Sequence, residues 1–177
     1  MKKLGFFYDQ SRCIACKTCQ AACKDKNNLP KEEYFRRLAA YPLLFSLSCN
    51  HCARPACVKA CKTGAMQKNE DGTVSVNAGL CIGCGACVWL CPYGSPKLGA
   101  LTGKSQKCDA CAGPRARGEA PACVAACPAY CLEFGDLQLF EKERGPGFAA
   151  VHPLSTDKNA TEPSVLIKLR KNRYAEN

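Results

Sequence analysis

The stretch Cys81-Ile82-Gly83-Cys84-Gly85-Ala86-Cys87-Val88-Trp89-Leu90-Cys91-Pro92 decides the fold of this chain. Three cysteines recur at every third position, and a fourth follows after three intervening residues. A loop with this spacing can wrap around a compact [4Fe–4S] cluster and supply three thiolates from one short segment. The fourth cysteine is expected on the following helical turn, where it ligates a neighbouring cluster instead. The proline after it turns the chain because proline has no backbone N–H to donate.

Related cysteine patterns occur four times, so the chain contains an internal repeat with loops of variable length. Of the 177 residues, 17 are cysteine, and the four groups use sixteen of them. The groups are Cys13, Cys16, Cys19 and Cys23; Cys49, Cys52, Cys57 and Cys61; Cys81, Cys84, Cys87 and Cys91; and Cys108, Cys111, Cys123 and Cys127. Cys131 is left over, and we expect it to be a packed free thiol rather than a ligand.

Two other interpretations of the cysteines are weaker. Disulfides need an oxidising compartment, and residues 1–9 do not have the pattern of a secretory signal. An odd cysteine count and compact triplets also fit a disulfide framework poorly. Zinc prefers paired CxxC segments brought together from separate places, which only the fourth group resembles. The triplets therefore favour iron–sulfur clusters.

Each cluster is expected to take three cysteines from one group and a single cysteine from a partner group. If the second group pairs with the third, and the first with the fourth, four ligand sets follow. Cluster 1 takes Cys13, Cys16, Cys19 and Cys127; cluster 2 takes Cys49, Cys52, Cys57 and Cys91; cluster 3 takes Cys81, Cys84, Cys87 and Cys61; and cluster 4 takes Cys108, Cys111, Cys123 and Cys23. Spacing alone leaves a second pairing open, of group one with two and three with four.

The composition excludes other classes of protein. No apolar run reaches the roughly 20 residues that span a bilayer. The formal charge of +10 suggests nucleic acid as an alternative partner, through a zinc-dependent binding module. The lysines and arginines are scattered, however, and no zinc-finger spacing is present. Four oxidised clusters of about −2 each would lower the net charge to about +2, so the basic residues are interpreted mainly as counterions.

Local patterns predict short elements around these loops. We expect strands at 4–9, 41–48, 73–76, 132–136 and 164–169, and helices at 19–26 and 137–143. Asp71-Gly72 is typical of a hairpin turn, and 144–147 should break the second helix.

The sequence resembles the iron–sulfur electron-transfer subunit (B subunit) of the dimethyl sulfoxide reductase family of molybdopterin oxidoreductases. The resemblance rests on Gly5-Phe6-Phe7-Tyr8-Asp9, Arg12-Cys13, Phe35-Arg36-Arg37, Ser48-Cys49-Asn50-His51-Cys52, Gly64-Ala65-Met66, Cys91-Pro92-Tyr93-Gly94 and Lys107-Cys108-Asp109. It covers residues 4–135. It implies the nested pairing of groups one with four and two with three, and four [4Fe–4S] clusters as cofactors.

The resemblance also implies an architecture: an α+β, loop-rich fold of two pseudo-symmetric bacterial-type 2[4Fe–4S] ferredoxin-like modules with a C-terminal extension. Residues 1–48 with 108–135 would hold clusters 1 and 4, and 49–107 would hold clusters 2 and 3. Residues 136–177 would dock on a partner subunit.

The implied function is electron relay in anaerobic respiration, with no bond-making chemistry in the chain itself. Single electrons would pass between a molybdenum or tungsten bis-pterin catalytic subunit and a membrane subunit linked to quinol. The chain would then be peripheral to the cytoplasmic membrane, exported with a signal-bearing partner, or else cytoplasmic. A free-standing soluble polyferredoxin is the alternative.

Several residues beside the ligands are of interest. Lys62 follows a predicted ligand of cluster 3, and a cation there should raise that cluster's potential. His51 is expected to be structural, and Trp89 to pack over the cluster. Gly83 and Gly85 flank Cys84 and would allow close approach of backbone N–H groups.

Overall fold

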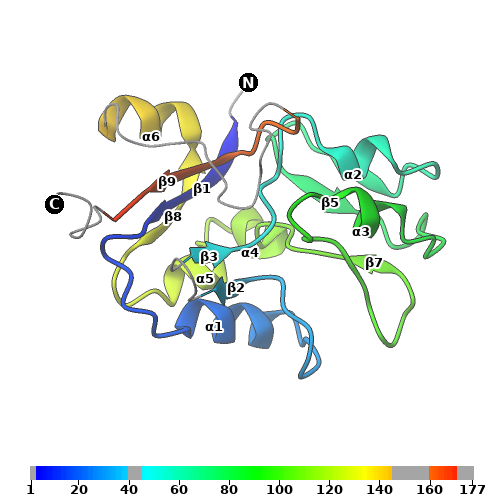
Figure 1. The fold of residues 1–177 in the computed structure, drawn as a ribbon, viewed down its shortest axis with the longest axis horizontal. Coiled ribbons are helices and arrows are strands. Elements are labelled where there is room, and N and C mark those ends of the chain that lie inside the picture. The colour runs from blue at the N-terminus through cyan, green and yellow to red at the C-terminus, as the bar shows by residue number, and fades with distance from the viewer. Residues whose placement is uncertain (1–2, 40–44, 145–159, 171–177) are drawn as a thin grey trace, which may run out of the picture.

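The computed structural model of the protein describes residues 3–39, 45–144 and 160–170. A three-stranded sheet lies at one end of the molecule (Figure 1), with the order β8-β1-β9. Its central strand, β1 (Leu4–Asp9), pairs antiparallel with β8 (Leu132–Asp136) and parallel with β9 (Val165–Lys168). The sheet therefore joins both ends of the described chain to the segment that follows the fourth cysteine group.

Aromatic residues build the core of this sheet, because their side chains pack well on a pleated, half-buried surface. Phe6 packs in one cluster with Leu132 and with most cysteines of the first and fourth groups. Phe7 points to the opposite face and packs on Leu137 of helix α6 (Leu137–Arg144). The close approach of the chain near β9 depends on Gly5, where an added Cβ would collide with the backbone oxygen of Ser164.

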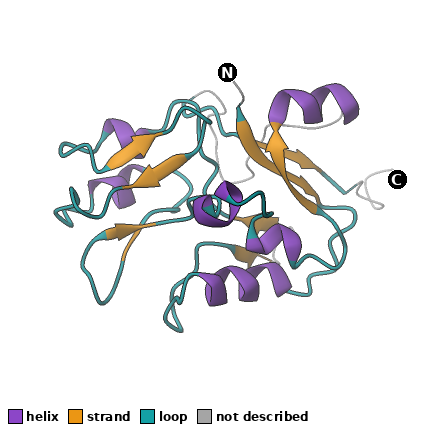
Figure 2. Ribbon diagram, turned by 180° about the vertical axis from the view of Figure 1, so that it is seen from behind, coloured by secondary structure: helices purple, strands orange, loops and turns teal. Residues whose placement is uncertain are grey.

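The remaining elements are short and are joined by long loops (Figure 2). Three two-stranded antiparallel hairpins are β2 (Arg37–Ala39) with β3 (Phe45–Leu47), β4 (Met66–Lys68) with β5 (Val74–Val76), and β6 (Lys97–Leu98) with β7 (Ser105–Gln106). The other helices are α1 (Thr18–Lys26), α2 (Ala56–Lys59), α3 (Ala86–Leu90), α4 (Ala112–Ala116) and α5 (Ala122–Ala125).

Most of the local predictions are confirmed. Strands occur at 4–9, 74–76 and 132–136, the turn at Asp71-Gly72 joins β4 to β5, and helices occur at 18–26 and 137–144. Of the strand expected at 41–48, the described part is β3, and 41–44 lie outside the described residues. The break expected at 144–147 falls mainly on residues outside the described part.

The short strand expected at 164–169 is confirmed as β9, and it lies within the chain's own sheet. Its residues Val165, Leu166 and Ile167 are buried there. The preceding residues also pack on their own chain, since Ser164 N–H donates to the Asn50 carbonyl at 2.8 Å. The docking of the tail on a partner stays a prediction.

The helices pack in a nested order. Helix α1, after the first triplet, packs against α5 of the fourth group, and α2 of the second group packs against α3 of the third. Helices α2 and α3 lie with β5 and β7 at the end of the molecule away from the large sheet (Figure 1). Within the described ranges, no helix has the length and apolar character needed to cross a membrane.

Candidate iron–sulfur sites

Three cavities, each partly open to solvent, are lined by cysteines. The cavity at α1 is lined by Cys13, Cys16, Cys19 and Cys127, together with the ungrouped Cys131; the cavity beside α2 by Cys49, Cys52, Cys57 and Cys91; and the cavity beside the β6–β7 hairpin by Cys61, Cys81, Cys84 and Cys87. Each set combines three cysteines of one group with a single cysteine of another. The structure thus brings together the residues expected for clusters 1, 2 and 3.

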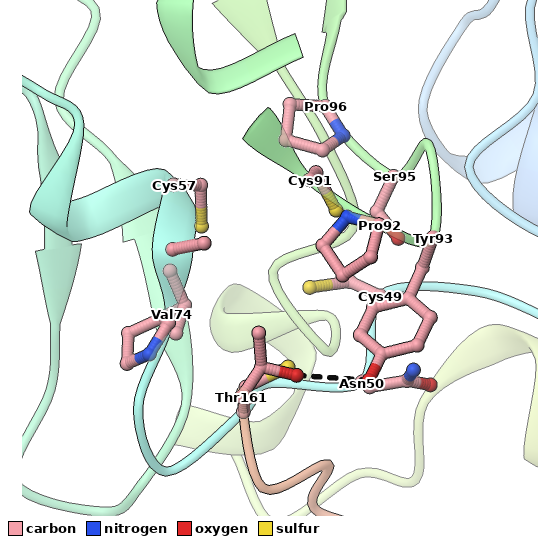
Figure 3. A pocket seen from close by; sticks show the side chains of 13 residues that line it. Cys49, Asn50, Cys57, Val74, Cys91, Pro92, Tyr93, Ser95, Pro96 and Thr161 are labelled. Atoms are coloured by element: carbon pink, nitrogen blue, oxygen red, sulfur yellow. Dashed lines mark hydrogen bonds between the residues drawn. The ribbon is translucent and has the colours of Figure 1, made fainter. Parts of the chain in front are cut away.

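Figure 3 shows how one of these cavities is built. Cys57 on α2 faces Cys49 and Cys91, which come from two separate loops, and their sulfur atoms point into the space between them (Figure 3). The Tyr93 and Thr161 hydroxyl oxygens lie 2.8 Å apart beside them, so the C-terminal segment closes one side of the cavity.

The four cysteines expected for cluster 4 lie close enough to interact electrostatically. In addition to burial, the charges of Cys123 and Cys111 raise the pKa of Cys23, and the charge of Cys123 raises that of Cys108. All four are buried. The helices that carry Cys23 and Cys123, α1 and α5, pack together. The fourth set is therefore also assembled in space, from segments about 100 residues apart.

All seventeen cysteines lie in the described part of the chain, and each has a free thiol there. Within that part, no three His, Cys, Asp or Glu side chains are placed to hold a single metal ion. The grouped cysteines instead line the cavities in sets of four, which is the number of ligands that a [4Fe–4S] cluster takes.

Hydrogen-bond donors point at the sulfur atoms in every group. Backbone N–H groups donate to Sγ from His51 to Cys49 at 3.5 Å, Met66 to Cys61 at 3.3 Å, Ser105 to Cys81 at 3.2 Å and Ala110 to Cys108 at 3.4 Å. In the first group the Thr18 hydroxyl donates to Cys16 at 3.4 Å. Such donors stabilise thiolates and set the potential of a bound cluster, so the sequence places them where a cluster needs them.

The loops share an unusual backbone conformation. The residue before the second cysteine has a left-handed φ in all four groups: Ala15 at 60°, His51 at 45°, Gly83 at 74° and Ala110 at 57°. For residues other than glycine this conformation costs about 1 kcal/mol or more. The strain recurs at one repeat position, which indicates that the shape of the loop around the cavity is what the sequence maintains.

Burial and local donors move the thiol pKa values in opposite directions. Burial raises the pKa of Cys57 to about 12 and that of Cys52 to about 11. At the exposed Cys16, hydrogen bonds from Thr18 lower the pKa instead. A bound iron ion deprotonates a coordinating thiol outright, so the buried cysteines would be ionised by the metal itself.

Two buried cations lie among the cysteines. Arg36 is 2% exposed and interacts with Cys123 and Cys108 of the fourth group and with Cys19 of the first. Its Nη atoms donate to the Ser46 and Ser48 hydroxyls, whereas its Nε has no hydrogen-bond partner among the described residues. A buried guanidinium with an orphaned N–H fits a site built around an anionic group.

The second buried cation is Lys107, which is 5% exposed. Its ammonium donates to Cys49 Sγ at 3.5 Å, to the Cys108 carbonyl at 2.7 Å and to the Val74 carbonyl. In the sequence, Arg36 and Lys107 are points of resemblance to the family without an assigned role. The only local signal is a lysine directly before a ligand cysteine, which does not by itself show burial.

The other residues singled out in the sequence lie as follows. His51 is completely buried between the second and fourth groups. Trp89 is 87% exposed, so the expectation that it packs over the cluster is wrong. Lys62 is exposed to solvent beside Cys61, where water and salt screen its charge, so the effect expected from the sequence on the potential of cluster 3 should be small. Cys131 is 3% exposed, with its sulfur 3.4 Å from Cys127 Sγ, and it lines the same cavity as the first triplet.

Comparison with known proteins agrees with this geometry. Residues 40–137 match the model of the 4Fe-4S dicluster domain, and residues 10–26 match that of a 4Fe-4S binding domain. The B subunit of the anaerobic dimethyl sulfoxide reductase of Escherichia coli strain K12 is 42% identical over 181 residues, which covers 93% of this chain and 87% of that protein.

Two further relatives extend the comparison. The corresponding subunit of Haemophilus influenzae is 40% identical over 99% of this chain and 92% of its own length. The B subunit of the polysulfide reductase of Wolinella succinogenes is 40% identical over 77% of this chain and 78% of its own length. With these matches, the cysteine repeat and the cavities it lines, the chain belongs to the iron–sulfur B subunits of the dimethyl sulfoxide reductase family of molybdopterin oxidoreductases.

Proposed function

We propose that the chain carries four [4Fe–4S] clusters, held by the sixteen cysteines in the four sets given above, and relays single electrons along them. The clusters supply one-electron redox chemistry when bound, and the chain's own residues hold them, shield them and set their potentials. Residues 1–48 with 108–135, and 49–107, are proposed as the two ferredoxin-like halves.

The observation that carries this proposal is the pattern of exposure along the sites. Among the sixteen cysteines only Cys16 and Cys84 are exposed, and they belong to clusters 1 and 3. The ligands of cluster 4 are all buried, and three of the four ligands of cluster 2 are buried too. A relay needs access for partners at its two ends and protection from solvent in its middle.

Electrostatic interactions between the sets support an order for the clusters. Cys19 of cluster 1 interacts with Cys123 of cluster 4, and Cys108 of cluster 4 with Cys49 of cluster 2. Clusters 2 and 3 share the packed helices α2 and α3. The proposed path is therefore 1–4–2–3, and it crosses between the halves at the 4–2 step.

Apolar side chains are exposed at both ends of this path. Ile14, which lines the cluster 1 cavity, is 67% exposed. Around cluster 3, Ile82 is 73%, Trp89 87% and Leu101 92% exposed. The loops of Ile82 and Leu101 touch, since a Cβ on Gly83 would lie 2.5 Å from the Gly103 carbonyl oxygen. Exposed apolar patches of this kind are typical of protein interfaces.

We assign the cluster 1 end to a molybdenum or tungsten bis-pterin catalytic subunit and the cluster 3 end to a membrane subunit linked to quinol. The chain would then be peripheral to the membrane through its partners and exported with a partner that carries the signal. These assignments rest on the family to which the chain belongs.

Two measurements test the proposal. Anaerobic purification should give about 16 Fe per chain, from four clusters of four, and fewer than about 12 would contradict it. Ile14→Glu should release the large subunit on co-purification and Ile82→Glu the membrane subunit, each with unchanged iron content. If both variants keep their partners, the assignment of the two ends is contradicted and a free polyferredoxin is favoured.

A further inference from the structure

One place in the molecule joins ligands of different clusters directly. The His51 backbone N–H donates to Cys49 Sγ at 3.5 Å, and its ring Nε2 lies 3.9 Å from Cys108 Sγ. Cys49 belongs to the set for cluster 2 and Cys108 to the set for cluster 4. A single residue therefore contacts a ligand sulfur on each side of the boundary between the two proposed halves.

The hydrogen bonds of the His51 ring fix where its proton lies. Nδ1 accepts a hydrogen bond from the Val74 backbone N–H at 2.9 Å, so Nδ1 carries no proton. In the neutral ring the proton is then on Nε2, which faces Cys108 Sγ. The Lys68 ammonium further fixes the loop by donating to the His51 carbonyl at 2.9 Å and to the Cys52 carbonyl at 2.7 Å.

Lys107 occupies the same boundary. Its ammonium contacts Cys49 Sγ and the carbonyl of Cys108, and it also donates to Val74, whose N–H holds the His51 ring. None of the ion pairs among the described residues involves Lys107. Its positive charge is therefore balanced by no carboxylate there; it donates to Cys49 Sγ of cluster 2 and acts electrostatically on Cys108 of cluster 4.

On the basis of the proposed function, we propose that Lys107 and His51 form a built junction between the two halves that raises the reduction potentials of clusters 2 and 4 together, relative to those of clusters 1 and 3. A buried positive charge stabilises the reduced, more negative state of both neighbouring clusters. An N–H donor on a ligand sulfur acts in the same direction.

The test is a mediated redox titration followed by electron paramagnetic resonance, on the iron-loaded protein purified anaerobically with whatever subunits accompany it. Lys107→Met should shift the midpoint potentials of clusters 2 and 4 downward and leave those of clusters 1 and 3 in place. Lys107→Arg, which keeps the charge, should restore most of the shift. The signals are assigned with Cys52→Ser and Cys111→Ser, which perturb clusters 2 and 4 respectively.

Lys62→Met is the matched control, because it removes a solvent-exposed lysine beside a ligand of cluster 3. Screening by water and salt should leave the potential of cluster 3 nearly unchanged. If Lys107→Met fails to assemble its clusters, His51→Leu takes its place; it removes the N–H donor to Cys108 Sγ and should lower the potential of cluster 4, and an unshifted cluster 4 would equally overturn the junction.

The possible outcomes separate this inference from the function it rests on. Normal iron content with unshifted clusters 2 and 4 in Lys107→Met, or equal shifts in all four clusters, overturns the junction and leaves the relay intact. A wild-type protein without four clusters overturns the relay itself.

Discussion

The third cysteine triplet allows a matched pair of substitutions to test whether close packing of its loop retains cluster 3. Gly83 and Gly85 lie on either side of Cys84, with φ of 74° and 76°. At Gly83 an added Cβ would lie 2.5 Å from the backbone oxygen of Gly103, whereas at Gly85 its nearest neighbours are side-chain atoms at 3.8 Å. Alanine is thus strained at both positions but collides with backbone at only one.

The size of the effect follows from the backbone strain and from the collision. Left-handed alanine costs about 1 to 2 kcal/mol at either position. The collision at Gly83 must move the 99–103 loop, and overpacking of this kind typically adds about 1 to 3 kcal/mol. If iron is lost through local opening of the loop, that difference corresponds to a roughly 5- to 150-fold larger open population in Gly83→Ala than in Gly85→Ala.

The assay is the rate at which an iron chelator bleaches the visible absorption of the anaerobic protein. Gly85→Ala should lose one cluster moderately faster than wild type, and Gly83→Ala should lose the same cluster about 5 to 150 times faster than Gly85→Ala. Equal rates in the two variants, or faster loss in Gly85→Ala, would refute the reasoning, because only the backbone collision distinguishes them.

Three other perturbations have definite expected outcomes. Gly5→Ala should lower the melting temperature by several degrees, about 2 to 4 °C per kcal/mol, because its Cβ would meet the Ser164 backbone oxygen, and calorimetry measures this. Cys131→Ala should leave the iron content intact and lower the potential of cluster 1, since it removes an S–H donor 3.4 Å from Cys127 Sγ, while Cys131→Ser should lie nearer to wild type in the same titration. Removing iron with a chelator should lower the helical circular dichroism signal, and an unchanged spectrum would show that the short helices fold without clusters.

The cysteine spacing alone was informative about the sites because it describes local geometry. Three cysteines within seven to nine residues, as at 13–19, 49–57 and 81–87, can reach only one cavity, and the three cavities are lined accordingly. The pairing of groups was not fixed by spacing, since it depends on contacts between segments far apart in sequence. The packing of α1 on α5 and of α2 on α3 supplies that information.

Other features depend on tertiary structure and left no local signal. The left-handed φ of Ala15, His51 and Ala110 goes against residue preference, because the surrounding loop imposes it. The strand at 165–168 was predictable from its apolar residues, but its parallel pairing with β1 was not, because register and partner are set by the sheet as a whole. Trp89 lies at an exposed position although its residue type suggested packing.

The structure shows that two of the chain's positive charges are buried, which the composition alone does not show. Arg36 and Lys107 are buried, and neither forms an ion pair among the described residues. Burying an unpaired cation costs several kcal/mol, and the thiols around these two are neutral until iron ionises them. Without clusters the folded chain would therefore contain two uncompensated charges. With anionic clusters beside them, the same charges become favourable, so cluster insertion and folding should be coupled through the cations as well as through the cysteines.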